Sequence, residues 1–230
     1  MSIPPAILFD FDGTLVASEN IWFIAHVEAL REFGVSSSES ELRELVGQNL
    51  HSVFSHFLAN SGVEQSSEEL AKAKAKFFQT VDEAALKLIP DYLKATPGAQ
   101  EALMRFRDIG SAVAICSNAP TYFVEATLSF LEMTDLVENI FSAANTDKGK
   151  PHPFVYQQAI DTLDLDKKQT LAVEDSKSGA AAALAAGIPV ALLNQTTDEA
   201  EMEVNCFPLK SLHELTPDFV LDILSRKNTF

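Results

Sequence analysis

The sequence predicts a parallel, doubly wound α/β sheet that carries an inserted all-helical domain. Short apolar runs rich in Ile, Val, Leu and Ala recur along its 230 residues, as in strands that are buried on both faces. Helical patterns separate these runs. From about residue 18 to residue 90 the strand pattern disappears, and the sequence is helical throughout. The predicted strands cover 7–11, 112–116, 140–143, 171–173 and 190–193.

The helices are predicted from their end signals and from residues that favour helix. Gly34 is expected to end a helix that begins near Glu19. Pro151 and Pro153 fix the start of a later helix near Pro153. The run SGAAAALAAG is a helix of small side chains, because alanine is the best helix former. The predicted helices cover 19–33, 39–46, 49–60 and 178–187, another runs from Pro97 until Gly110 ends it, and three others begin near residues 66, 120 and 153.

The domain boundaries are predicted from where the strand pattern stops and resumes. Residues 1–17 and 91–230 form the α/β core, and residues 18–90 form the helical domain. A chain of 230 residues is long enough for a core domain with a smaller insert.

Composition limits the partners and the location of the protein. The net charge of −16 disfavours nucleic acid and anionic membranes, although a local cation can still bind a small anionic substrate. No apolar stretch approaches the ~18 residues of a membrane span, and the N-terminus has no basic region typical of a secretory signal. Cys116 and Cys206 form no disulfide or zinc pattern. We therefore expect a cytoplasmic protein that is a monomer or a weak dimer.

Polar residues follow several of the predicted strands. Ligands of open α/β sheets bind outside the carboxyl ends of the strands, so such residues can converge in one crevice. They are Asp10 and Asp12, Ser117 and Asn118, and Glu174 and Asp175.

A bound cation is the simplest explanation for these clustered acids. Four carboxylates in one crevice would raise one another's pKa, whereas Mg²⁺ prefers oxygen ligands and commonly binds carboxylates together with a substrate phosphate. Lys150 precedes a helix start that also favours anions. Each signal alone has a plainer interpretation, because Asp-x-Asp-Gly also forms solvated turns and single lysines are usually surface charges. Together they favour Mg²⁺ and a phosphoryl group.

These motifs resemble those of the haloacid dehalogenase superfamily of phosphohydrolases, in its β-phosphoglucomutase and phosphoglycolate phosphatase branch. The similar segments are DFDGT at 10–14, Ser117-Asn118, Lys150 in GKPHP, and Glu174-Asp175 in VEDS. The resemblance covers almost the whole chain, and it implies a Rossmann-like core with a small helical cap domain after the first motif.

The resemblance also implies a role for each motif residue. Asp10 would be the nucleophile that forms an aspartyl-phosphate, and Asp12 would be the general acid and then the general base. Ser117, Asn118 and Lys150 would hold the phosphoryl oxygens. The residues implied to bind Mg²⁺ are Asp10, Asp12 through its main-chain carbonyl, Asp175, and Glu174 directly or through water.

The helical domain is expected to determine specificity. Ala17 stands where this branch usually has an acid. The mutases of the branch have a histidine where this chain has Trp22 and an arginine near GQN at 47–49, and because both are missing here we expect a phosphatase, with a phosphosugar mutase as the alternative. Trp22 could instead only pack between the helical domain and the core. The candidate substrate contacts are Glu19, Asn20, Trp22, His26 and Gln48.

Three other functions compete with a phosphatase. A dehalogenase on this fold would need neither Mg²⁺ nor Asp12. A phospho-acceptor signalling domain would be shorter and would lack the helical insert. A ligand-binding protein without activity would have lost some motif positions, whereas all are present here. The expected substrate is a small phosphorylated metabolite, of the sugar phosphate, phosphoglycolate or phosphogluconate type.

Overall fold

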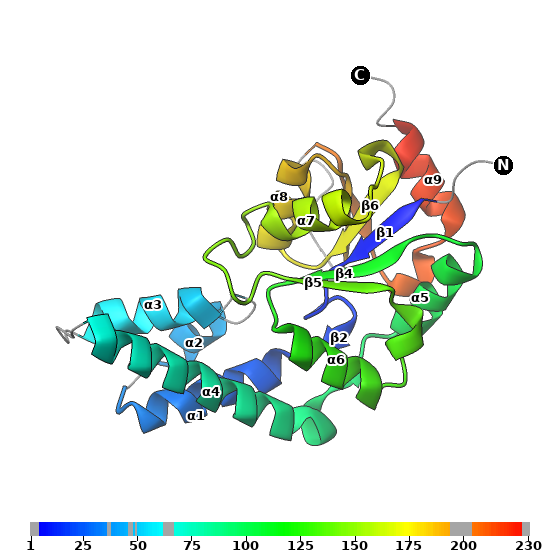
Figure 1. Cartoon of the computed structure of the whole chain (residues 1–230). Helices are drawn as coiled ribbons and strands as arrows, with labels where there is room; N and C mark the ends of the chain where they lie inside the picture. The colour runs from blue at the N-terminus through cyan, green and yellow to red at the C-terminus, as the bar shows by residue number, and fades with distance from the viewer. Residues whose placement is uncertain are drawn as a thin grey trace.

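Six parallel strands form the sheet at the centre of the molecule (Figure 1). The computed structural model describes residues 5–35, 38–45, 48, 50–61, 67–193 and 204–226. The strand order is β5-β4-β1-β6-β7-β8, which confirms the predicted doubly wound fold. The strands are β1 (Ala6–Phe9), β4 (Val113–Ser117), β5 (Asn139–Ser142), β6 (Thr170–Glu174), β7 (Val190–Leu193) and β8 (Cys206–Leu209).

The order of the strands reverses between β1 and β6. After β1 the chain builds β4 and β5 on one side, and then crosses to build β6, β7 and β8 on the other. A crevice opens outside the carboxyl ends of the strands at such a reversal. The register pairs Phe9 with Val173, so Asp10 and Glu174, the next residues of the two strands, lie side by side.

Alternate residues of the strands enter two separate hydrophobic cores. Ile7 and Phe9 belong to the larger core, whereas Leu8 belongs to the smaller one, as the two-residue repeat of a strand requires. Alanines of the helix predicted over 178–187 pack in the smaller core. The larger core includes α5 (Ala99–Asp108), α6 (Thr121–Phe130) and α9 (Pro217–Arg226), and the smaller includes α7 (Phe154–Thr162) and α8 (Lys177–Ala186).

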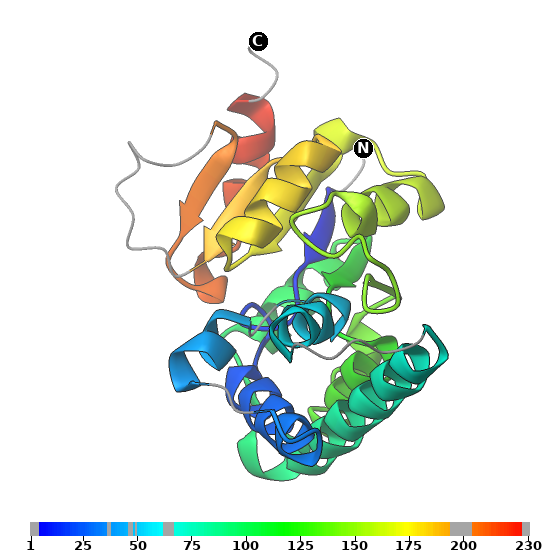
Figure 2. The same ribbon diagram turned by 90° about the vertical axis from the view of Figure 1, so that its left-hand side faces the viewer.

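A helical segment, residues 19–92, projects from the sheet on the side away from the two chain ends (Figures 1 and 2). Its first and last helices pack along each other, and Phe77 contacts Phe33 and Phe54 between them. The predicted helix start at residue 66 lies outside the described residues. The helices are α1 (Glu19–Glu32), α2 (Glu39–Leu45), α3 (Leu50–Ser61) and α4 (Ser67–Tyr92).

Two short strands connect the helical segment to the core. β2 (Val16–Ala17) and β3 (Lys94–Ala95) pair antiparallel, so the chain enters and leaves the helical segment at one place. Neither strand was predicted from the sequence, because two residues are too short to display a periodicity. β8 was also not predicted, because Pro208 argues against a strand, although proline is tolerated at the sheet edge.

The described residues also bear on the expected environment. Among them, no helix is both long enough and apolar enough to cross a lipid bilayer. Cys116 is a buried free thiol, as predicted, and Cys206 is also free. Burial raises the pKa of the Cys116 thiol, so it is protonated at neutral pH.

Candidate active site

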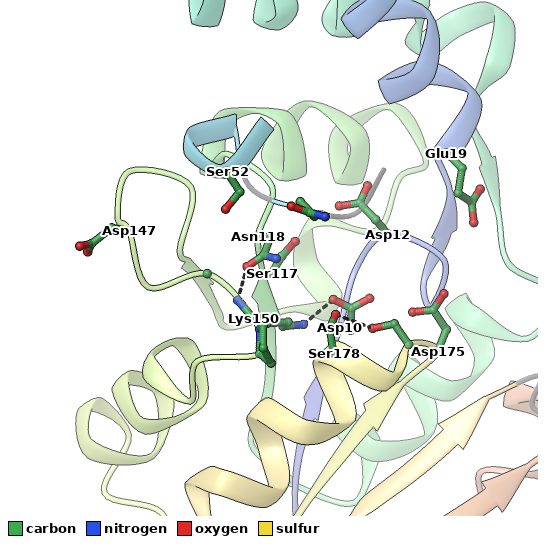
Figure 3. A pocket seen from close by; sticks show the side chains of 14 residues that line it. Asp10, Asp12, Glu19, Ser52, Ser117, Asn118, Asp147, Lys150, Asp175 and Ser178 are labelled. Atoms are coloured by element: carbon green, nitrogen blue, oxygen red, sulfur yellow. Dashed lines mark hydrogen bonds and ion pairs between the residues drawn. The ribbon is translucent and has the colours of Figure 1, made fainter. Parts of the chain in front are cut away.

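The carboxyl ends of β1, β4 and β6 border one cavity of about 510 Å³ (Figure 3). Core residues form one wall, and Glu19 of α1 and Ser52 of α3 reach it from the helical segment. Ser52 and Asp147 were not predicted. The structure therefore brings together residues that are far apart in the sequence. The predicted site residues that line this cavity are Asp10, Asp12, Glu19, Gln48, Ser117, Asn118, Lys150 and Asp175.

Lys150 pairs with two buried acids at the base of the cavity. Its Nζ donates to Asp10 Oδ1 at 2.5 Å, to Glu174 Oε1 at 2.6 Å and to the Cys116 carbonyl at 2.8 Å. These are the three donors of an ammonium group, and all are used. Burial lowers the pKa of Lys150, but the charges of Asp10 and Glu174 raise it more, so the net pKa is raised and the side chain stays charged.

The loop that carries Lys150 is tied to the end of β4. The Lys150 amide donates to Asn118 Oδ1 at 2.9 Å, and the Lys150–Pro151 peptide bond is cis. Ser117 Oγ accepts a hydrogen bond from the Ala119 amide at 2.9 Å. The Ser117 hydroxyl can still donate its own proton, since a hydroxyl both donates and accepts. Ser117 and Asn118 thus shape the loops of the cavity as well as lining it.

Glu174 is completely enclosed and positions Lys150. Besides Lys150, its Oε1 accepts a hydrogen bond from the Tyr156 hydroxyl at 2.6 Å, and Ser176 Oγ lies 3.4 Å from Oε2. A Cβ at residue 179 would overlap the Glu174 carboxylate, so only glycine fits there. Sequence reasoning missed Tyr156, although a tyrosine on the buried face of a helix usually needs a polar partner.

Three carboxylates lie close enough to share a metal ion. One oxygen each of Asp10, Glu174 and Asp175 lies within 4.8 Å of the other two. Burial raises the pKa of Asp175, and the nearby charges of Asp10 and Glu174 raise it further. A Cβ at residue 13 would overlap the Asp175 carboxylate, and the φ of Gly13, +87°, is in the left-handed region that favours glycine. The oxygen-only donor set and the unrelieved repulsion between the acids fit a hard divalent cation.

The Asp12 side chain turns away from this cluster and toward the helical segment. Its Oδ1 accepts hydrogen bonds from Ser18 Oγ and from Trp22 Nε1, the latter at 2.8 Å. Burial raises the Asp12 pKa to about 6, against the lowering effect of these two hydrogen bonds. A carboxyl group with this pKa can both donate and accept a proton near neutral pH.

The predicted substrate contacts of the helical segment divide into three groups. Glu19 and Gln48 line the main cavity. Trp22, His26 and Gln48 line a second, smaller cavity of about 20 Å³ beside Asp12. Asn20 is exposed and is not among the lining residues of either cavity.

Trp22 has both a packing role and a polar contact. Its ring lies 4.5 Å, centroid to centroid, from the ring of Phe123 in α6, while its indole N–H reaches Asp12. The packing alternative considered from the sequence is therefore correct as far as it goes. The hydrogen bond to Asp12 is additional, and no sequence pattern indicated it.

Comparisons with known proteins agree with this geometry. Residues 7–193 match the sequence profile of the haloacid dehalogenase-like hydrolases. Hexitol phosphatase B of Escherichia coli is 29% identical over 190 residues, which is 81% of this chain and 83% of that protein. A phosphoglycolate phosphatase of Cereibacter sphaeroides is 27% identical over 223 residues, 96% of this chain and 100% of that protein.

A solved structure shares the whole fold. CbbY from Rhodobacter sphaeroides, in complex with xylulose-1,5-bisphosphate, superposes with a TM-score of 0.78 at 24% sequence identity. The match covers 93% of this chain and 96% of that one. At this identity the likeness concerns the fold alone.

Proposed function

Because this chain belongs to the haloacid dehalogenase-like hydrolase family, we propose that it is a Mg²⁺-dependent phosphatase that hydrolyses a small phosphorylated metabolite. It is a phosphoric monoester hydrolase, like the relatives that are named phosphatases. One observation carries the mechanistic part of the proposal: Asp10, Asp12, Lys150 and Asp175 border a single cavity at the strand reversal. The substrate class includes sugar phosphates, phosphoglycolate and phosphogluconates.

In the first step, Asp10 attacks the phosphorus atom. A bond forms between a carboxylate oxygen of Asp10 and phosphorus, and the bond from phosphorus to the leaving alcohol breaks. Asp12 gives its proton to the leaving oxygen. The raised pKa of Asp12, about 6, supports this role, because part of the population holds a proton at neutral pH. The product of this step is an aspartyl-phosphate on Asp10.

In the second step, water releases the phosphate. The Asp12 carboxylate, now without its proton, accepts a proton from a water molecule as the water oxygen attacks phosphorus. The bond between phosphorus and the Asp10 oxygen breaks, and inorganic phosphate leaves. Ser117, Asn118 and Lys150 are assigned to the phosphoryl oxygens because all three line the cavity. Lys150, whose three donors are already used, would act on these oxygens through its positive charge. Lys150 also holds Asp10 in place through its 2.5 Å contact.

The acid cluster is the assigned Mg²⁺ site. Asp10 and Asp175 would bind the ion with their carboxylates, and Asp12 with its main-chain carbonyl. Glu174 would contribute through Oε2 or through water, because its Oε1 already accepts two hydrogen bonds. When bound, Mg²⁺ supplies positive charge that offsets the charge on the phosphoryl oxygens.

We assign residues 18–90 as a cap domain over the core formed by residues 1–17 and 91–230. Glu19 and Gln48 of this segment border the same cavity as Asp10. The paired strands β2 and β3 are the connection at which the cap would move relative to the core. Closure of such a cap excludes water from the site and completes it around the substrate.

Hydrolysis of p-nitrophenyl phosphate tests this function. We expect turnover that requires Mg²⁺ and that falls at least about 10³-fold in Asp10→Asn, because the amide cannot act as the nucleophile. The matched control is Asp108→Asn at the exposed end of α5, which should retain the wild-type rate. Tandem mass spectrometry after an acid quench should find phosphate on Asp10. Equal rates for Asp10→Asn and the wild type would refute the nucleophile assignment.

A further inference from the structure

His26 is a buried side chain whose ring nitrogens have no hydrogen-bond partner among the described residues. It is 2% exposed, and neither ring nitrogen has a hydrogen bond to any residue that the structure describes. Burial lowers the pKa of His26 to about 4, so the ring is neutral at physiological pH. An unsatisfied buried polar group is destabilising, and most such groups in folded proteins are paired. A ligand group that reached either nitrogen would therefore gain a hydrogen bond that the described residues do not supply.

The space beside His26 suits one small polar group. The His26 cavity, about 20 Å³, is lined by His26, Trp22, Leu50 and Pro120, among others. That volume admits roughly one water-sized group. The His26 cavity also shares Asp12 with the main cavity. It therefore adjoins the carboxyl group assigned to protonate the leaving alcohol.

The charges around the main cavity disfavour a second anionic group on the substrate. Among its described lining residues Lys150 is the one cation, and Asp10 and Glu174 already occupy it. Glu19 and Asp147 add further acids to the wall. A carboxylate or second phosphate on the substrate would therefore meet like charges. A substrate that is uncharged apart from its phosphate group would not meet this repulsion.

We infer that the His26 cavity receives a hydroxyl group of the leaving alcohol, which makes His26 a specificity-determining residue for phosphate esters of uncharged polyhydroxy compounds. A neutral imidazole offers one donor and one acceptor, and a hydroxyl group, which both donates and accepts, can pair with either of them. Because the cavity lies beside Asp12, the recognised hydroxyl is one close to the ester oxygen. This inference rests on the proposed phosphatase function and narrows its substrate class.

Three phosphate esters that differ at one carbon test the inference on the wild-type enzyme with Mg²⁺. The group bonded to the ester carbon is a hydroxymethyl group in 2-hydroxyethyl phosphate, a methyl group in ethyl phosphate and a carboxylate in phosphoglycolate. We expect kcat/KM for hydroxyethyl phosphate to exceed that for each of the others by about tenfold, the usual value of one hydrogen bond. Equal values, or phosphoglycolate as the best of the three, would overturn the inference.

Variants at residue 26 test whether His26 is the source of the preference for hydroxyethyl phosphate over ethyl phosphate. In His26→Leu we expect the ratio of kcat/KM for hydroxyethyl phosphate to that for ethyl phosphate to fall to about one. In His26→Gln, which keeps a donor and an acceptor, part of the ratio should return. The matched control is His56→Leu in α3, where the lost histidine pairs with Glu41 and is not among the residues lining either cavity. An unchanged ratio in His26→Leu would show that the cavity holds water only, and would overturn the inference.

The outcome for p-nitrophenyl phosphate separates the two proposals. A wild-type enzyme that hydrolyses p-nitrophenyl phosphate with Mg²⁺ but does not prefer hydroxyethyl phosphate refutes only the assignment of the His26 cavity. A wild-type enzyme that hydrolyses none of the four esters refutes the phosphatase function, and the inference falls with it.

Discussion

The buried polar groups at the strand ends are paired with one another, whereas a buried polar group on the helical segment is not hydrogen-bonded to any residue that the structure describes. At the strand ends, the buried Lys150 already contacts both Asp10 and Glu174 within 2.6 Å. On the helical segment, His26 is equally buried, but its ring nitrogens lack a hydrogen-bond partner among the described residues. Residues of both regions line the main cavity (Figure 3) and the smaller cavity beside it.

The difference assigns different tasks to the two regions. A reaction step benefits from groups that are fixed before the substrate arrives, since no energy is then spent on reorganisation at the moment of reaction. Discrimination between substrates benefits from polar groups that only the correct substrate satisfies. Asp12 belongs to both regions, because it follows a core strand but is held by Ser18 and Trp22.

Among the substitutions proposed at the strand ends, removing Lys150 should lower the free energy of unfolding most. Lys150→Met would leave Asp10 and Glu174 buried without a countercharge. We expect the free energy of unfolding to fall by about 3–5 kcal/mol, the usual cost of breaking a buried ion pair. Urea denaturation monitored by circular dichroism measures this change. The rate of p-nitrophenyl phosphate hydrolysis should fall by at least about 10²-fold with it.

A neighbouring lysine provides the control for this prediction. Lys148 is exposed and lies two residues before Lys150 in the same loop. Lys148→Met should change the free energy of unfolding by less than about 0.5 kcal/mol. If Lys150→Met proved as stable as Lys148→Met, the strand ends would not depend on their ion pairs, and the contrast between the two regions would be lost.

Trp22→Phe tests the hydrogen bond from Trp22 to Asp12, the residue that lies between the strand ends and the helical segment. Phenylalanine can keep the packing against Phe123, but it cannot donate to Asp12. An alkyl phosphate needs a proton on its leaving oxygen, whereas p-nitrophenolate leaves readily without one. We therefore expect kcat/KM to fall about tenfold more for ethyl phosphate than for p-nitrophenyl phosphate.

A structural role alone would lower both rates equally, and that outcome would exclude Trp22 as a positioning residue for Asp12. Because Trp22 is the single tryptophan of the chain, its fluorescence reports directly on this contact in the wild type. Binding of phosphate with Mg²⁺ should change that emission if the cap closes over the site.

The core could be predicted because its strands are buried on both faces and therefore appear as continuous apolar runs. The strand predicted over 190–193 has the bounds of β7, and those predicted over 112–116 and 171–173 lie within one residue of β4 and β6. The first strand was predicted too long, since β1 ends at Phe9. Parallel strands end at the same edge, so the convergence of their polar ends followed from the fold class.

The partners of these residues could not be predicted in the same way. Tyr156 meets Glu174, and Trp22 meets Asp12, only through packing between elements that are distant in the sequence. Helical periodicity places a residue on a face but does not identify what that face contacts. For the same reason the sequence did not separate Asn20, which is exposed, from Glu19, which lines the main cavity.

The burial of His26 predicts a loss of stability in acid. The pKa of His26 is lowered from 6.5 to about 4 in the folded protein, so between these values the unfolded chain binds a proton that the folded chain does not. Stability therefore falls as the pH decreases through this range. Other groups also titrate there, and acids with raised pKa values, such as Asp12 and Asp175, act in the opposite direction.

The difference between the wild type and His26→Leu isolates the histidine. From about pH 7 to pH 5, the wild type should lose about 2 kcal/mol more unfolding free energy than His26→Leu. Urea denaturation at each pH measures both, and His213→Leu, at an exposed position, should keep the wild-type slope. Parallel slopes for the wild type and His26→Leu would mean that His26 has a polar partner in the folded protein. The helical segment would then be as fully satisfied as the strand ends, and the basis for a hydroxyl site beside Asp12 would disappear.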